Sequence, residues 1–125
     1  MNLQNQAEEF RYYFGVTNHC DNRDFQLNLI TEEFLEFTEA HNVMFDAPEN
    51  EADALKELAD LVYVCFQYAE NLEWDLLEAL DRVHKSNMSK LGEDRKIIRR
   101  EDGKILKGPN YKPPYLNDLC HLVCK

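Results

Sequence analysis

Two groups of acidic residues have the residue types and spacing for metal chemistry. The first group comprises Glu32, Glu33, Glu36 and Glu39, and the second comprises Glu57 and Asp60. Residues three or four positions apart are neighbours on a helix, and like charges so placed destabilise it by roughly 0.2–0.5 kcal/mol per pair. When a divalent cation binds between such carboxylates, their proximity becomes stabilising instead of destabilising. Magnesium and manganese prefer oxygen ligands, which carboxylates supply. The spacing therefore makes these carboxylates candidate metal ligands.

A solvated acidic face is the alternative explanation, and it suits Glu32 and Glu39 best. These two point away from the apolar stripe of their own segment, which comprises Leu27, Ile30, Phe34 and Phe37. The second group is harder to explain in that way, because Glu57 and Asp60 share a side with Val64 and precede a turn that is apolar all round. Charges at the edge of a buried surface need partners or a metal ion. Two helices that each carry an acidic pair are a plausible metal cage within a bundle.

The elements that must position these residues are helices. Apolar residues recur at helical spacing in four segments, over residues 5–14, 24–42, 50–71 and 76–90, which predicts an all-α bundle of four to five helices. Residues 61–66 are apolar throughout, which is typical of a helix at the centre of a bundle or an interface. After Gly92, two short β-prone runs flank Asp102 and Gly103, so we expect a hairpin followed by an irregular tail.

The length of 125 residues suits one domain. We expect a single domain over residues 1–125, with a helical body at 5–91 and a basic, phosphate-binding tail at 92–116. A single helical layer of this size buries little surface, so helices shared across a dimer are expected. Residues 1–81 carry 19 acidic and 3 basic residues, whereas residues 82–112 carry 10 basic and 4 acidic residues. Such an acidic body disfavours binding to nucleic acid.

The cellular location follows from what the sequence lacks. No apolar run approaches the roughly 18 residues that a membrane span needs. The first residues have neither the basic start nor the apolar core of a secretion signal. We therefore expect no membrane partner and a cytoplasmic location.

Four polar residues late in the chain are candidates for nucleotide and phosphate contacts: Asn87, Lys90, Lys107 and Tyr111. Lysine offers a point charge to phosphate, and asparagine can hydrogen-bond a base or a sugar. On the residues alone, ordinary helix-end stabilisation is the simpler explanation for Asn87 and Lys90. For Lys107 and Tyr111 a solvated hairpin is the alternative, but the positive charge of the segment favours a ligand contact. Gly108 and Pro109 are suited to a turn that presents those two residues.

Taken together, these motifs resemble the MazG-like all-α nucleotide pyrophosphohydrolases. EEFLE at 32–36 followed by ELAD at 57–60 has their E-E-x-x-E … E-x-x-D arrangement. VHKSNMSKLGED at 83–94 and DGKILKGPNYKPP at 102–114 resemble a subgroup similar to phosphoribosyl-ATP pyrophosphohydrolases, some of which act on dUTP. The resemblance spans about residues 24–116, and all five acidic positions match. It shifts our preference for Asn87 and Lys90 towards ligand contact.

The resemblance implies a role for each matching residue. Glu33, Glu36, Glu57 and Asp60 would hold Mg²⁺, with Mn²⁺ as a substitute. Glu32 would ligate or orient a water, and Glu32 and Glu33 are the candidates for the catalytic carboxylates. Water would attack the α-phosphorus of a nucleoside triphosphate, releasing a monophosphate and pyrophosphate, as in the house-cleaning of a nucleotide pool.

The resemblance specifies neither a single substrate nor a single oligomeric state. By analogy, dUTP is the leading substrate, while other pyrimidine nucleotides, damaged nucleotides and phosphoribosyl-ATP remain open. The resemblance also implies a homodimer, or a dimer of dimers, with a tail that closes over the nucleotide.

Two other functions compete with this hydrolase. One is a module of the same fold that binds or senses Mg²⁺-nucleotide without catalysis, which the complete set of five acids argues against. The other is a di-iron carboxylate bundle, but such bundles use two Glu-x-x-His motifs. This sequence offers one imperfect copy, Asp81 followed by His84.

Overall fold

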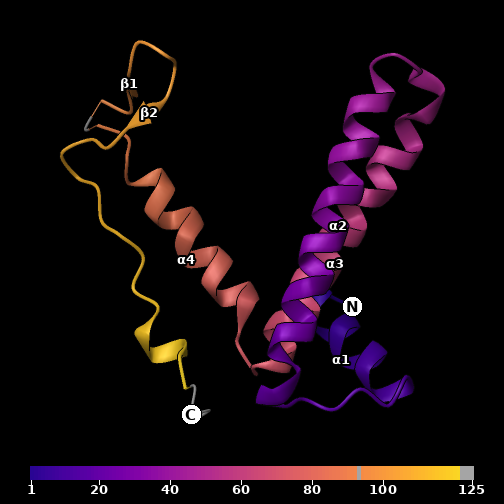
Figure 1. Ribbon diagram of the computed structural model, residues 1–125. Helices are drawn as coiled ribbons and strands as arrows, with labels where there is room; N and C mark the ends of the chain where they lie inside the picture. Colours follow the sequence, from indigo (N-terminus) through magenta and orange to yellow (C-terminus); the bar gives the residue numbers. More distant parts are fainter. Residues whose placement is uncertain (93, 122–125) are drawn as a thin grey trace. The chain divides into compact units, whose positions relative to one another are not determined.

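The computed structural model describes residues 1–92 and 94–121 of the protein. This part of the chain contains the α-helices α1 (Leu3–Tyr13), α2 (Arg23–Met44), α3 (Glu51–Asn71) and α4 (Leu76–Met88), and the short strands β1 (Ile98–Arg99) and β2 (Ile105–Leu106) (Figure 1). Single 3₁₀ turns occur at Cys20–Asn22, Pro48–Asn50 and Asn117–Leu119. The prediction of an all-α fold with a short hairpin is confirmed. None of the described helices has the length and apolar character needed to cross a membrane.

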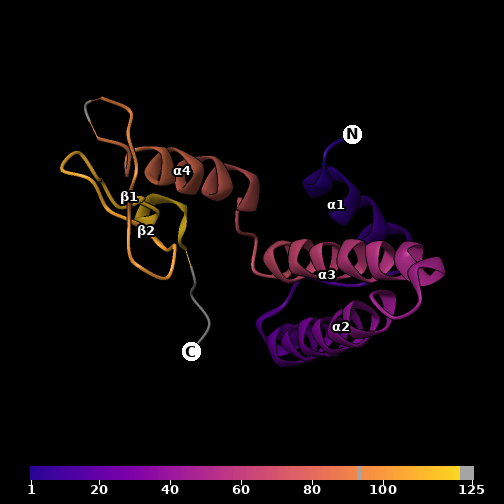
Figure 2. The same ribbon diagram turned by 90° about the horizontal axis from the view of Figure 1, so that it is seen from above.

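The described chain divides into two compact units, Met1–Asp75 and Leu76–His121. In the first unit α2 and α3 run antiparallel, and α1 lies on the other side of α3 (Figure 2). Helix α3 is therefore the central helix of its unit, as its apolar run predicts. Full burial of a phenylalanine is worth about 1.5–3 kcal/mol, and Phe66 of α3 is only 4% exposed. The small buried residues Ala7, Ala54 and Ala69 let the helices approach closely.

The apolar stripe of α2 is less buried than its spacing predicts. Leu27 is 52% exposed and Phe34 is 55% exposed, so neither belongs to the core of this unit taken alone, where the helical spacing would place them. On α3, three apolar residues at helical spacing are likewise exposed: Leu55, Leu58 and Val62. The physical reason is that within Met1–Asp75 helix α2 packs against α3 along one side only, and α1 packs against α3.

In the second unit the chain after the hairpin returns along α4. The Ser86 hydroxyl donates to the carbonyl oxygen of Lys112 at 2.7 Å, and the Lys112 amide donates to the Ser89 hydroxyl at 3.0 Å. Further along, Arg82 forms an ion pair with Asp118. These contacts fasten the tail to one side of α4.

The hairpin predicted from the Asp-Gly pair is present. Its strands are antiparallel, with Ile98 opposite Leu106 and Arg99 opposite Ile105. Gly103 has a φ of +90°, in the region that favours glycine, which explains why the turn requires this residue.

Candidate metal centre

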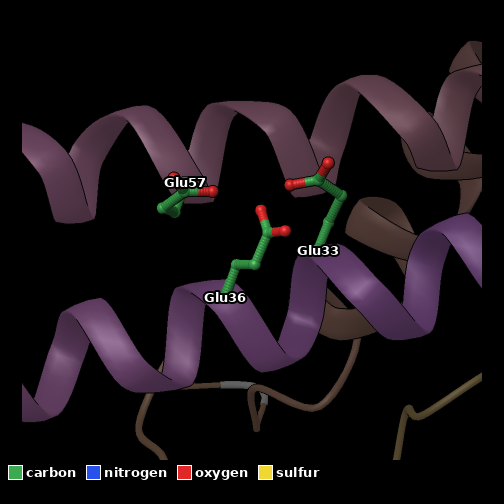
Figure 3. Close-up of side chains that lie close together, drawn as sticks. All are labelled: Glu33, Glu36 and Glu57. Atoms are coloured by element: carbon green, nitrogen blue, oxygen red, sulfur yellow. The ribbon is translucent and has the colours of Figure 1, made fainter.

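Three of the predicted metal ligands converge between α2 and α3. Glu33 and Glu36 stand one helical turn apart on α2, and Glu57 projects from α3 toward them (Figure 3). One carboxylate oxygen from each lies within 4.8 Å of the other two. We call these three residues the carboxylate group. Each helix supplies its residues through local spacing, but the antiparallel packing of α2 on α3 brings the two sides together.

The carboxylate group lacks hydrogen-bond donors where it is most buried. The Glu57 side chain is 19% exposed, and Glu33 is half-buried. Oxygen Oε2 of Glu33 and oxygen Oε2 of Glu57 are both buried, and neither has a hydrogen-bond partner among the described residues. A buried polar atom left without a partner costs roughly 1–3 kcal/mol, and more when it is charged. A bound cation is one way to meet that cost.

The electrostatics of the site point the same way. The pKa of Glu33 is raised above its usual 4.5, first by burial and then by the negative charges of Glu36, Asp60 and Glu57, together with a hydrogen bond to Glu36. All three causes disfavour the charged carboxylate. A divalent ion among these oxygens would favour the charged form instead.

The donor set fits a hard cation. All the converging atoms are carboxylate oxygens, which suit magnesium and manganese better than softer metals. Mg²⁺ normally keeps several waters and uses a small number of carboxylates. A cleft of about 600 Å³ opens beside the group, and Glu36 and Glu57 belong to its lining. That volume is within the usual range for small-ligand pockets.

The remaining acidic candidates lie outside the carboxylate group. Asp60 is half-buried on α3, and its Oδ2 lies 2.7 Å from the ammonium of Lys56. The same ammonium is 3.5 Å from Oε1 of Glu57. Glu32 is exposed on α2. Glu39 is also exposed and contributes to the cleft wall.

The four candidate nucleotide contacts all belong to the second unit. The amide of Gly108 donates to the carbonyl oxygen of Lys90 at 2.9 Å, which joins the turn after the hairpin to the end of α4. The Lys107 ammonium lies 4.7 Å from the centre of the Tyr111 ring. Asn87 is exposed, and its carbonyl oxygen accepts from the Lys90 amide at 3.2 Å. The contact of Gly108 with Lys90 thus brings the segment of Lys107 and Tyr111 to the end of α4, where Asn87 and Lys90 lie.

Sequence reasoning assigned Gly108 to a turn but missed how closely this turn approaches Lys90. A Cβ at position 108 would lie 2.5 Å from the Lys90 carbonyl oxygen, so only glycine allows the approach. Its signal was the glycine itself, between two candidate residues. Lys56 was also missed, although it is one of three basic residues in the first 81 and directly precedes Glu57.

Comparison with known proteins adds one match. A family model described as phosphoribosyl-ATP pyrophosphohydrolase matches residues 15–87. The matched region is more than half of the chain, contains all of α2 and α3, and ends at Asn87. No curated protein matches the chain.

Proposed function

Because the chain belongs to the phosphoribosyl-ATP pyrophosphohydrolase family, we propose that it is a magnesium-dependent nucleoside triphosphate pyrophosphohydrolase. The family points to hydrolysis of pyrophosphate bonds. The observation that carries the proposal is the carboxylate group of Glu33, Glu36 and Glu57, with its two buried oxygens that lack donors among the described residues. Acidic oxygens arranged in this way suit the Mg²⁺ that accompanies nucleotide phosphates.

In this proposal Glu33, Glu36, Glu57 and Asp60 hold the cation, and Mn²⁺ can replace Mg²⁺. When bound, the cation supplies positive charge that offsets the charge on the phosphates and makes nearby water more acidic. The exposed side chain of Glu32 orients the attacking water. Either Glu32 or Glu33 accepts its proton.

The reaction is a substitution at the α-phosphorus. The water oxygen forms a bond to that atom, and the bond to the oxygen that bridges the α and β phosphates breaks. The electron pair leaves with pyrophosphate, which keeps the bridging oxygen, and the other product is the nucleoside monophosphate. The proton lost by water passes to the carboxylate.

A nucleotide panel tests this reaction directly. The panel contains dUTP, other pyrimidine and purine nucleoside triphosphates and phosphoribosyl-ATP, each with Mg²⁺ or Mn²⁺, with pyrophosphate and phosphate measured separately. We expect pyrophosphate release, with dUTP as the preferred substrate. Phosphoribosyl-ATP is the second candidate because the matching family carries that description. Mg²⁺-dependent thermal stabilisation by a nucleotide without any product would instead indicate a binding module.

Asp60→Asn is the sharpest variant for the site. It keeps the shape of the side chain but removes a charge from the ligand set, so we expect activity to fall by at least about a hundredfold. Circular dichroism should remain that of the wild type. Glu9→Gln, which removes a charge from the exposed surface of α1, is the control. Wild-type turnover by Asp60→Asn would refute the assignment.

The residues at the end of α4 bind the substrate in this proposal. Asn87 contacts the base or sugar, while Lys90, Lys107 and Tyr111 contact the phosphates. The close approach of Gly108 to Lys90 supports a pre-organised surface, because it ties the two parts of this set together.

Gly108→Ala tests that arrangement. The added methyl group forces the turn away from α4, and we expect KM to rise about tenfold. Steady-state kinetics measures this change. Glu101→Gln, at an exposed position of the hairpin, is the control and should keep the wild-type KM. An unchanged KM in Gly108→Ala would contradict the role given to this turn.

A dimer is part of the same proposal. The exposed apolar residues on α2 and α3, such as Phe34 at 55% and Leu55 at 68%, support a further helical partner for this face. Light scattering after size-exclusion chromatography measures the mass of the particle. A purely monomeric protein would refute the dimer. The metal site would still be tested by the nucleotide panel and by Asp60→Asn.

A further inference from the structure

Lys56 occupies an unusual place for a basic residue. The first 81 residues contain Arg11, Arg23 and Lys56 as their basic residues, against 19 acidic ones. Of these three, Lys56 stands beside the carboxylate group. Its ammonium lies 2.7 Å from Oδ2 of Asp60 and 3.5 Å from Oε1 of Glu57.

Helix geometry alone gives little reason for the contact with Asp60. A lysine placed four residues before an acidic residue is the less favourable order for such a pair on a helix. The Lys56 side chain is also 67% exposed, and an isolated exposed ion pair contributes little. The ammonium has more to gain here, because both Asp60 and Glu57 attract it and Glu57 belongs to the carboxylate group.

The ion pair with Lys56 also accounts for the position of Asp60 outside the carboxylate group. Glu33, Glu36 and Glu57 converge, whereas Asp60 is outside that group and bonded to Lys56. A cation that binds all four carboxylates needs an oxygen of Asp60 at about 2.0–2.1 Å. An ammonium and a divalent cation that share that carboxylate repel each other, because both are positively charged.

We propose that Lys56 is a built-in counter-cation of the metal site: it holds Asp60 while the site is empty and is displaced when the divalent cation binds. This inference rests on the proposed metal site. Its consequence is that metal binding is an exchange of one cation for another. Lys56 thereby stabilises the empty protein and lowers its affinity for the metal, so it acts as a positioning residue for Asp60.

The test is calorimetric titration of the protein with MnCl₂ in the absence of nucleotide. Lys56→Met removes the charge while keeping a long side chain and a similar helix propensity. We expect this variant to bind Mn²⁺ about threefold to fivefold more tightly than the wild type. Its melting temperature should be lower than that of the wild type without metal, and the difference should shrink at saturating Mn²⁺. Lys56→Arg keeps the charge and should restore wild-type behaviour in both measurements.

Lys85→Met is the matched control. Lys85 of α4 forms an ion pair with Asp81 at 2.8 Å, again four residues apart and with a 73% exposed lysine, but it belongs to the second unit. Its Mn²⁺ affinity should equal that of the wild type.

The outcomes separate this inference from the proposed function. If the wild type and Lys56→Met bind Mn²⁺ equally well, or if the variant binds more weakly, the counter-cation role is wrong while the metal site stands. If neither protein binds Mn²⁺, the metal site and the role of Lys56 both fail. If the variant alone binds, Lys56 blocks the site more strongly than we propose, and displacement is supported.

Discussion

Two clusters of buried polar side chains lie along helix α3, and they differ in whether protein atoms compensate their charge. The first cluster lies near the C-terminal end of α3. Arg11 of α1 is only 4% exposed there, yet each of its guanidinium nitrogens has an acceptor. It donates to side-chain oxygens of Asn18 at 2.6 Å, Gln67 at 3.2 Å and Asn71 at 2.8 Å. We call these four residues the arginine network. Because its charge is met by protein atoms, the network needs no ligand.

Toward the N-terminal end of the same helix, the carboxylate group is incomplete. Glu57 faces Glu33 and Glu36, so like charges meet there, and two buried oxygens have no donor among the described residues. Buried polar atoms therefore have two meanings in this protein. A cluster whose charged group donates to protein acceptors holds α1 on α3, although Nε2 of Gln67 has no partner among the described residues. A cluster of like charges with unmet acceptors is the place to expect a ligand.

The largest effect on stability should come from breaking the arginine network. Arg11→Met keeps much of the side-chain volume but leaves the acceptor oxygens of Asn18 and Gln67 without the Arg11 donor. We expect a loss of about 2–4 kcal/mol in the free energy of unfolding, measured by urea denaturation. Stabilisation by Mg²⁺ should persist in the variant. A loss below about 1 kcal/mol would mean that the network is not structural, and the comparison would fail.

A change of opposite sign should follow from Glu33→Gln. Removing this charge relieves the repulsion within the carboxylate group, so the metal-free protein should gain roughly 0.2–0.5 kcal/mol for each like-charged neighbour. The same variant should lose its stabilisation by Mg²⁺, because a ligand is gone. Thermal melts with and without Mg²⁺ measure both effects, with Glu9→Gln as the unchanged control. Destabilisation of the metal-free variant would show that Glu33 is already satisfied.

The smallest effect concerns Glu70, which borders the arginine network. Burial raises the pKa of Glu70, the negative charge of Glu8 adds to this, and Arg11 opposes it. The folded protein then holds the Glu70 proton more tightly than the unfolded chain, so this contribution is present below pH 4.5 and is lost as the pH rises through the raised pKa. Glu70→Gln should therefore be more stable than the wild type near neutral pH, by roughly 0.2–0.5 kcal/mol. Melting curves from pH 4 to pH 7 measure the difference, and a constant gap across that range would contradict the assignment.

The sequence by itself determined the helices, their order and the hairpin. These features are local: apolar spacing of three and four residues specifies a helix face, and an Asp-Gly pair specifies a tight turn. The spacing of Glu33 and Glu36, and of Glu57 and Asp60, identified the candidate ligands for the same reason. Two carboxylates on one helix are neighbours whatever the rest of the chain does.

Only the tertiary structure decided which of those carboxylates meet and what surrounds them. The convergence of Glu57 with the pair on α2, and the pairing of Asp60 with Lys56 instead, depend on how far α2 and α3 are shifted along each other. The contact of Gly108 with Lys90 likewise joins segments that are distant in the sequence. The physical reason is that helix propensity and periodicity act within a few residues, whereas distances between helices result from the packing of whole surfaces.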